Sequence, residues 1–256
     1  MREINVLSKR KFTKEDNPIF LLKSMKHEYL ENTIKYGRFC FNHPNIFNRW
    51  EDQESAQYDK WDAHSAYAIT RIVVNPQKDE TTGVPIIDSG IQYKAEGEMH
   101  FQNDYVKHTP ICCFRCIRIK DVEVGHNDEV YFTLGDIAER IEKEFGHDSY
   151  LIVPARPFLE LFAKKVQGFS AMEVLYQDTL NDYPFLPLRK PTREILEQLF
   201  RKDNKYAWQK EYRIVLSPTN NSPVFKAIGS IEDMAVYGKI GELKDKKCIY
   251  HLNQDN

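Results

Sequence analysis

Residues 18–41, PIFLLKSMKHEYLENTIKYGRFCF, carry the strand–helix–strand pattern from which the fold class is predicted. Pro18–Leu22 is a continuous apolar run too short for a helix, which indicates a buried strand. Met25–Tyr36 has apolar residues near helical spacing, with Ser24 as a candidate N-cap. Gly37 is placed to end this helix with a positive φ, and Arg38–Phe41 reads as the returning strand.

The rest of the chain mixes strands and helices without regular β–α–β alternation. Strands are predicted at 66–75, 90–98, 108–120, 150–153, 170–176 and 211–217, with shorter ones near 224–228 and 247–252. A turn is predicted at 79–83, and helices are predicted to begin at Thr133, Pro157 and Pro191. This pattern predicts an α+β fold, a single domain with a mixed, mostly antiparallel sheet flanked by helices. We expect this domain to span residues 18–256, after an N-terminal arm at 1–17.

Composition is typical of a globular chain that is not a general polyanion binder. The 256 residues are 41% hydrophobic and 29% charged, so a sizeable core can be buried. The formal net charge of −2 argues against a polybasic protein. No apolar stretch approaches the roughly 20 residues that cross a bilayer, and the first residues do not resemble a secretory signal. We therefore expect a cytoplasmic protein without a membrane partner.

Three of the five cysteines are crowded together, at Cys112, Cys113 and Cys116. A structural zinc site usually needs two such pairs, so Cys40 or Cys248 would have to complete it. Residues 113 and 116 point to opposite faces of a regular strand, which counts against chelation. The odd number of cysteines also makes a poor disulfide framework. The pattern favours reduced cysteines, and we expect no metal.

Several signatures of common enzyme classes are absent from the sequence. Neither the phosphate-binding G-x-x-x-x-G-K-[ST] loop nor the dinucleotide-binding G-x-G-x-x-G loop occurs. The G-x-S-x-G turn of the α/β-hydrolases is missing as well. These absences argue against a P-loop nucleotidase, a Rossmann dehydrogenase and an α/β-hydrolase.

Two segments carry residue types suited to a site. In residues 38–51 the aromatic side chains of Phe41, Phe47 and Trp50 lie near Asn48 and Arg49. Aromatic rings beside amide and charged groups suit a planar polar ligand such as a nucleotide base, although such a loop can also be anchored in the core.

The second segment, residues 205–216, leads from Trp208 into an apolar strand. Glu211 and Arg213 share one face of that strand because alternate residues point the same way. The two residues either form a structural ion pair or present the Glu211 carboxylate at a cleft.

Together the two segments resemble a family of bacterial and phage-associated domains of unknown function. That family has an F-N-D-P-[FW]-[DE] loop, matched here by Phe47-Asn-Arg-Trp-Glu51 with Arg49 in place of Asp and without the proline. Its later W-x-x-E-x-E-[WY]-R signature is matched by Trp208-Gln-Lys-Glu-Tyr-Arg213, which is shorter by one acidic step. Met172–Tyr176 lies where the family has a V-x-Y strand. The likeness covers about residues 18–217 in the order of elements.

The element order also resembles the layout of ADP-ribosyltransferases, which bind NAD with a first-strand residue and use a glutamate on a late strand. The resemblance implies that Glu211 is catalytic and stabilises the oxocarbenium-like transition state as nicotinamide leaves. It implies that Lys23 or Ser24 meets the nicotinamide ribose or a phosphate, and that Phe39, Phe41 or Phe47 stacks on nicotinamide. The residues that it assigns to NAD binding are Lys23, Ser24, Phe41, Phe47, Asn48, Arg49 and Arg213. Such an enzyme would be a toxin or phage-defence effector that modifies protein or nucleic acid.

Two alternatives remain open. Residues 189–213 carry a local excess of four positive charges interleaved with aromatic residues, which is typical of single-strand nucleic-acid surfaces and also of an ordinary solvated helix face. In this reading the chain is a non-catalytic module that binds nucleic acid, a protein target or an antitoxin or defence-system partner, through Arg201, Lys202, Lys205, Tyr206, Trp208 and Lys210. A metal-dependent nuclease would instead use Glu51, Asp52 and Glu211.

Overall fold

The computed structural model of the chain describes residues 17–47, 65–74, 79–82, 91–101, 104–126, 129–177 and 198–251. For residues 45, 47, 65–74, 91–101, 104 and 177 it describes the backbone only. The expected N-terminal arm therefore lies outside the described residues, apart from Asn17.

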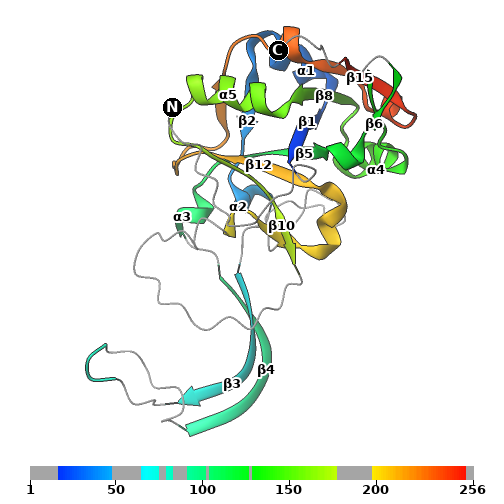
Figure 1. Cartoon of the computed structure of the whole chain (residues 1–256). Helices are drawn as coiled ribbons and strands as arrows, with labels where there is room; N and C mark the ends of the chain where they lie inside the picture. The colour runs from blue at the N-terminus through cyan, green and yellow to red at the C-terminus, as the bar shows by residue number, and fades with distance from the viewer. Residues whose placement is uncertain are drawn as a thin grey trace.

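A six-stranded antiparallel sheet forms the centre of the molecule and confirms the predicted α+β class (Figure 1). Its strand order is β14–β8–β1–β5–β12–β9. The bounds are β14 Val236–Lys239, β8 Ser149–Pro154, β1 Pro18–Met25, β5 Ile111–Arg118, β12 Glu211–Val215 and β9 Ser170–Glu173. Neighbouring strands come from distant parts of the chain, so the sheet is built almost entirely from long-range pairings.

The first strand is longer than predicted, and this changes the start of the helix that follows. Strand β1 continues to Met25, and helix α1 spans His27–Tyr36. The prediction that Ser24 caps this helix is wrong, because Ser24 is still paired with Tyr150 of β8. The cap comes instead from Asp148, whose carboxylate accepts a hydrogen bond from the His27 amide at 2.7 Å.

Helix α1 ends at Gly37, as predicted, with a φ of 56°. A Cβ atom at this position would lie 2.3 Å from the carbonyl oxygen of Gly229, so the turn also requires a close backbone approach. The chain then enters β2 (Arg38–Phe41), which pairs with β13 (Val224–Ala227) outside the central sheet.

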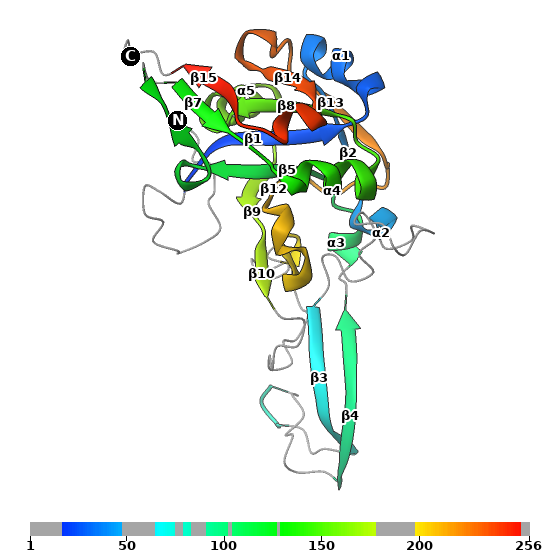
Figure 2. The same cartoon turned by 90° about the vertical axis from the view of Figure 1, so that its right-hand side faces the viewer.

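One face of the sheet is covered by α1, by β2 and by α5 (Ala155–Lys165). Their apolar side chains, including Leu30 of α1, Phe41 of β2 and Phe158 of α5, form the largest buried cluster with alternate residues of the strands. In Figure 2 the strands β8, β1 and β5 run across the view, one below another.

The opposite face has two smaller apolar clusters. The first packs α4 (Asp136–Phe145), β7 (Glu129–Phe132), β15 (Lys247–His251) and the 3₁₀ helix η7 (Ile240–Leu243) against β1 and β8. The second gathers Val106 of α3 (Asp104–Lys107), Leu199 and Phe200 near β5 and β12. Residues 191–197 of the helix predicted from Pro191 lie outside the described residues, and only Gln198 is described as helical.

Smaller pairings complete the fold. The predicted strands 66–75 and 90–98 appear as the antiparallel pair β3 (Ser65–Val74) and β4 (Ile91–Phe101), a ribbon that projects from the main body (Figures 1 and 2). The predicted strand 170–176 is split at Val174 into β9 and β10 (Leu175–Gln177), and β10 pairs in parallel with β11 (Arg201–Asp203). The short elements are α2 Pro44–Phe47, β6 Glu123–Val124, η3 Ile119–Asp121, η5 Asn204–Gln209 and η6 Glu232–Met234. Among the described residues, every helix is too short or too polar to cross a membrane.

Candidate functional site

A set of polar side chains interrupts the apolar packing on the second face of the sheet, beneath η5. The strand register aligns Leu22, Arg115 and Glu211 across β1, β5 and β12, and places Arg213 opposite Cys113. Because directly opposed residues share a face, Arg115, Glu211 and Arg213 all point to this side. Ser24 points the same way because it alternates with Leu22. We call Ser24, Arg115, His147, Lys202, Glu211 and Arg213 the polar patch.

Glu211 lies at the centre of the polar patch and is paired on both oxygens. Its Oε1 lies 2.7 Å from the ammonium nitrogen of Lys202, and its Oε2 accepts a 2.8 Å hydrogen bond from Nε of Arg213. The exposed fractions are 9% for Lys202, 8% for Glu211 and 0% for Arg213, so all three charges are buried together. Sequence analysis predicted the shared face of Glu211 and Arg213, and the structure shows that they form the ion pair.

Further hydrogen bonds fix the three charged groups. Arg213 also donates to the Leu199 carbonyl at 2.7 Å, and Lys202 donates to the side-chain oxygen of Gln209 at 2.8 Å. The Glu211 amide donates to the Tyr176 hydroxyl at 2.8 Å. These contacts link β12 to β10, to β11 and to the C-terminal end of η5.

The electrostatic consequence is a carboxylate that stays ionised despite its burial. Burial alone would raise the pKa of Glu211, but the charges of Arg213 and Lys202 outweigh it and hold the pKa below its usual range. The pKa of Tyr176 is raised by burial and by the Glu211 charge, so its phenol stays neutral. The patch therefore presents a permanent negative charge flanked by two positive ones.

Ser24 pairs with a histidine that the sequence did not single out. Its hydroxyl oxygen lies 2.9 Å from Nδ1 of His147, in the loop between α4 and β8. Burial, followed by the charges of Lys23 and Lys26, lowers the pKa of His147 to about 4. The imidazole is therefore neutral near pH 7 and can exchange a hydrogen bond with Ser24 in either direction.

Lys23 occupies the opposite face from Ser24, on the side of Leu21 and Met25. The pairing between β1 and β5 ends at Leu22. Beyond that point the Lys23 ammonium of β1 donates a hydrogen bond to the Cys113 carbonyl of β5 at 2.8 Å. Of the two first-strand residues that the resemblance offered for ligand binding, only Ser24 shares a face with Glu211.

The aromatic residues proposed to hold a nicotinamide ring divide into two groups. Phe39 and Phe41 are core residues, with Phe41 fully buried and its ring centroid 6.0 Å from that of Phe162. The side chain of Phe47 and all of Asn48 and Arg49 lie outside the described residues, as do Glu51 and Asp52 of the nuclease alternative.

The residues of the nucleic-acid alternative are engaged mostly within the molecule. Lys202 is buried in the polar patch, and Lys210 is paired with Asp121 at 2.6 Å. The Trp208 ring stacks on Phe145 with centroids 5.8 Å apart, and Arg140 covers it at 3.9 Å. The ammonium groups of Lys202 and Lys205 both lie over the ring of Tyr206. Lys205 is exposed, whereas Tyr206 and Arg201 are half-buried. This segment is thus mainly a packed cover on the sheet.

The cysteines behave as the strand geometry predicted. Cys113 packs with Val106 and its neighbours on one face of β5, whereas Cys116 is in the cluster of the other face. Burial raises the pKa of the Cys116 thiol to about 11, which keeps it neutral. Cys40 is exposed on β2, and Cys248 lies far along the chain on β15.

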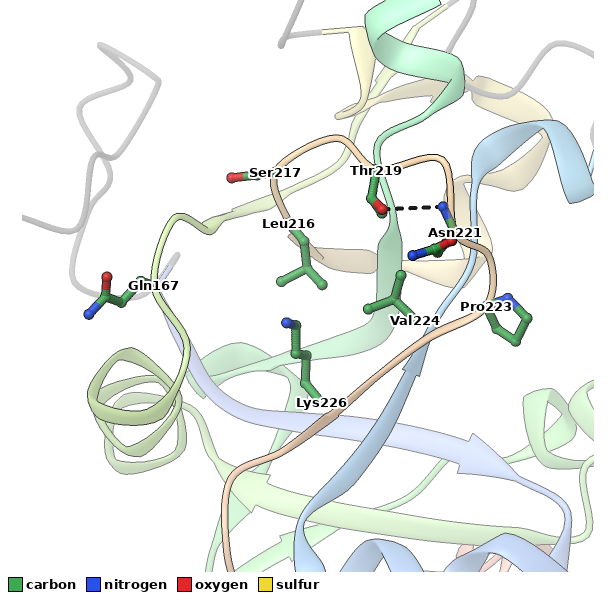
Figure 3. A pocket seen from close by; sticks show the side chains of 8 residues that line it. All are labelled: Gln167, Leu216, Ser217, Thr219, Asn221, Pro223, Val224 and Lys226. Atoms are coloured by element: carbon green, nitrogen blue, oxygen red, sulfur yellow. Dashed lines mark hydrogen bonds between the residues drawn. The ribbon is translucent and has the colours of Figure 1, made fainter.

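A separate pocket of about 410 Å³ opens beside β13 (Figure 3). Leu216, Val224 and Pro223 supply apolar walls, and Lys226 points from β13 toward Leu216. The remaining lining residues are Gln167, Ser217, Thr219 and Asn221. None of the residues predicted from the sequence to form a site lines this pocket.

The sequence did not reveal the importance of Lys202, Tyr176, Gln209 and His147 to the polar patch. The one available signal was weak: Lys202 lies two residues after the apolar pair Leu199-Phe200, on a segment that enters the core. Tyr176 and His147 come from segments that meet β12 and β1 only in the folded sheet. Local spacing therefore contains no information about them.

Comparisons with known proteins cover families, curated proteins and solved structures. No family model matches the chain, and neither the curated proteins nor the solved structures offer a significant match. Any function must therefore be argued from the polar patch itself.

Proposed function

We propose that the chain is an NAD-using, ADP-ribosyltransferase-like enzyme in which Glu211 is the catalytic carboxylate. The observation that carries the proposal is the position of the Glu211 carboxylate between Arg213 and Lys202 on β12, an internal strand of the sheet, and these two cations favour its ionised form. A fixed negative charge is what this reaction requires, because positive charge develops on the ribose as nicotinamide leaves.

The pairing of Glu211 leaves capacity for a substrate hydroxyl. A carboxylate has about four lone-pair positions, and Lys202 and Arg213 take one on each oxygen. Glu211 is 8% exposed, and the proposal assigns a ribose hydroxyl of NAD to the lone-pair positions that the two cations leave. The two cations hold the carboxylate in one orientation before the substrate arrives, which is the preorganisation that electrostatic catalysis uses.

In the reaction the bond between ribose C1′ and the nicotinamide nitrogen breaks, and its electron pair leaves with neutral nicotinamide. A nucleophile of the target then bonds to C1′ and loses its proton to solvent. Ser24 is the first-strand residue that the proposal assigns to the ribose or a phosphate, because it shares the face of Glu211. The target is either protein or nucleic acid, and the transfer assay below distinguishes the two.

Calorimetric titration of the purified full chain with NAD is the first test, followed by release of nicotinamide and transfer of label from NAD to lysate protein or nucleic acid. We expect binding and transfer by the wild type. Glu211→Asp keeps the charge but withdraws it by one methylene, so we expect it to bind NAD with at least a hundredfold loss of transfer. Glu211→Gln should abolish transfer.

Glu173→Gln is the matched control. Glu173 lies on neighbouring β9, where it pairs with Arg118 on the opposite face of the sheet. We expect this variant to retain transfer, and circular dichroism checks that each variant is folded. A wild-type chain that neither binds nor consumes NAD contradicts the proposal, as does full activity in folded Glu211→Asp.

A further inference from the structure

Three side chains with metal-ligating atoms gather at the edge of the molecule, on the antiparallel pair β7 and β15. They are Glu129, Cys248 and His251, and one ligating atom from each lies within 4.8 Å of the others. This group is distinct from the crowded cysteines of β5 and from the polar patch. It combines a thiol, an imidazole and a carboxylate, the ligand types that zinc takes in proteins.

A β-bulge in β15 is what brings Cys248 and His251 together. In a regular strand, residues three apart point to opposite faces, which is why Cys113 and Cys116 are separated on β5. In β15 the register shifts between Cys248 and Tyr250, so that Cys248 lies opposite Tyr131 while His251 lies opposite Glu129. The extra residue turns His251 to the side of Cys248.

The distances suit a single tetrahedral ion. The Cys248 sulfur lies 3.9 Å from Nε2 of His251. Bond lengths of about 2.3 Å to sulfur and about 2.0 Å to nitrogen place two tetrahedral ligands about 3.5 Å apart, so a small movement closes the site. Oε1 of Glu129 lies 3.9 Å from the other ring nitrogen, Nδ1, so a zinc ion held by Nε2 requires the carboxylate to move toward Nε2 as well.

The carboxylate has a supporting partner of the kind found behind metal ligands. The Tyr131 hydroxyl donates to Oε2 of Glu129 at 2.7 Å, which leaves Oε1 directed toward His251. The nearby ammonium of Lys246 is paired with Glu123 and lies over the Tyr131 ring, 4.6 Å from its centroid. The local positive charge is therefore balanced by a second carboxylate.

We propose that Glu129, Cys248 and His251 form a zinc site with three protein ligands and a fourth position for water. The thiolate and imidazole select zinc over magnesium or calcium, which prefer oxygen ligands. The ion would fasten β15 to β7 and stabilise their pairing, because it binds the folded arrangement only. This inference uses none of the residues of the NAD proposal, so each stands or fails alone.

The test titrates the metal-free full chain with zinc in competition with a coloured chelator, and with cobalt to detect a thiolate-to-metal charge-transfer band. We expect one zinc per chain, a thiolate band with cobalt, and a higher melting temperature with zinc. Cys248→Ser and His251→Gln should each weaken zinc binding at least tenfold, and Cys248→Ser should lose the cobalt band. Glu129→Gln, which keeps an acceptor for Tyr131, should weaken binding less than Cys248→Ser.

Cys40→Ser is the matched control, because Cys40 is an exposed thiol on a different strand pair. We expect it to keep the affinity, the cobalt band and the stabilisation by zinc. The proposal is overturned if the wild type binds no zinc at stoichiometric concentration, if Cys248→Ser binds as tightly as the wild type, or if the cobalt band follows Cys40.

Discussion

At the scale of single residues, the polar patch places three full charges inside the protein. Burying a charged group costs free energy because the group loses its water. The ion pairs of Glu211 with Lys202 and Arg213 offset this cost only while all three residues are present. Two neutral acceptors, the Gln209 side chain and the Leu199 backbone carbonyl, complete the hydrogen bonding. The same arrangement that keeps Glu211 ionised therefore makes each member sensitive to replacement.

Arg213→Met is expected to destabilise the protein by about 3–5 kcal/mol, because it leaves Glu211 with a single cation and the Leu199 carbonyl without its donor. Equilibrium urea denaturation measures the loss. The control is Arg156→Met, which removes an arginine whose ion-paired side chain is 89% exposed, and it should change stability little. Equal stability of the two variants would show that the buried pair is not a structural requirement.

Sequence reasoning at this scale succeeds where the partners are close in the chain. The shared face of Glu211 and Arg213 follows from alternation along one strand, and the positive φ of Gly37 follows from its place after a helix. It fails for Lys202, which lies nine positions before Glu211, because the six-residue helix η5 between them turns the chain back before the ammonium reaches the carboxylate. The excess of basic residues around Lys202 indicates a surface, whereas the fold uses this lysine as a buried counterion.

At the scale of elements, the start of α1 shows how a distant loop can determine a boundary. The Asp148 carboxylate accepts hydrogen bonds from the His27 amide at 2.7 Å and from the Ser149 hydroxyl at 3.2 Å. Because the capping residue is 121 positions away in sequence, no local pattern identifies it. The extension of β1 through Ser24 has the same origin, since pairing with β8 holds these residues extended.

Asp148→Ala is expected to destabilise the fold by about 1 kcal/mol, because the amide of His27 at the start of α1 loses its acceptor. Asp148→Asn retains a side-chain oxygen and should recover most of that loss. Chemical denaturation of the three proteins at constant pH and salt measures the difference. An unchanged Asp148→Ala variant would mean that the cap contributes nothing to stability.

At the scale of the whole molecule, the sheet order is the feature that the sequence predicts least. Most strands and helices are found within a few residues of their predicted bounds, because periodicity and turn residues are local signals. Yet β1 lies between β5 and β8, and β12 lies between β5 and β9, through pairings of residues that are far apart in the chain. The polar patch depends on this order, since it assembles side chains from β1, β5, β12, β11 and the loop before β8.

The stability of the whole molecule should also depend on pH through His147, which lies in the loop before β8 and contacts Ser24 of β1. Its pKa falls from the usual 6.5 to about 4 because of burial and the charges of Lys23 and Lys26, with Asp148 as the opposing acidic neighbour. Between these values the unfolded chain binds a proton that the folded chain does not, so stability falls as the pH is lowered. Glu211, whose pKa is also lowered, loses its ion pairs only at more acidic pH.

The wild type is therefore expected to lose about 2 kcal/mol more stability than His147→Gln when the pH is lowered from about 7 to about 5. Glutamine keeps a hydrogen-bonding partner for Ser24 but does not titrate, so this part of the pH dependence disappears. His126→Gln, at an exposed position, should retain the wild-type pH dependence. Urea denaturation of the three proteins at both pH values measures the effect. If the free energy of unfolding of His147→Gln falls with pH as steeply as that of the wild type, protonation of His147 does not limit the stability of the fold in acid.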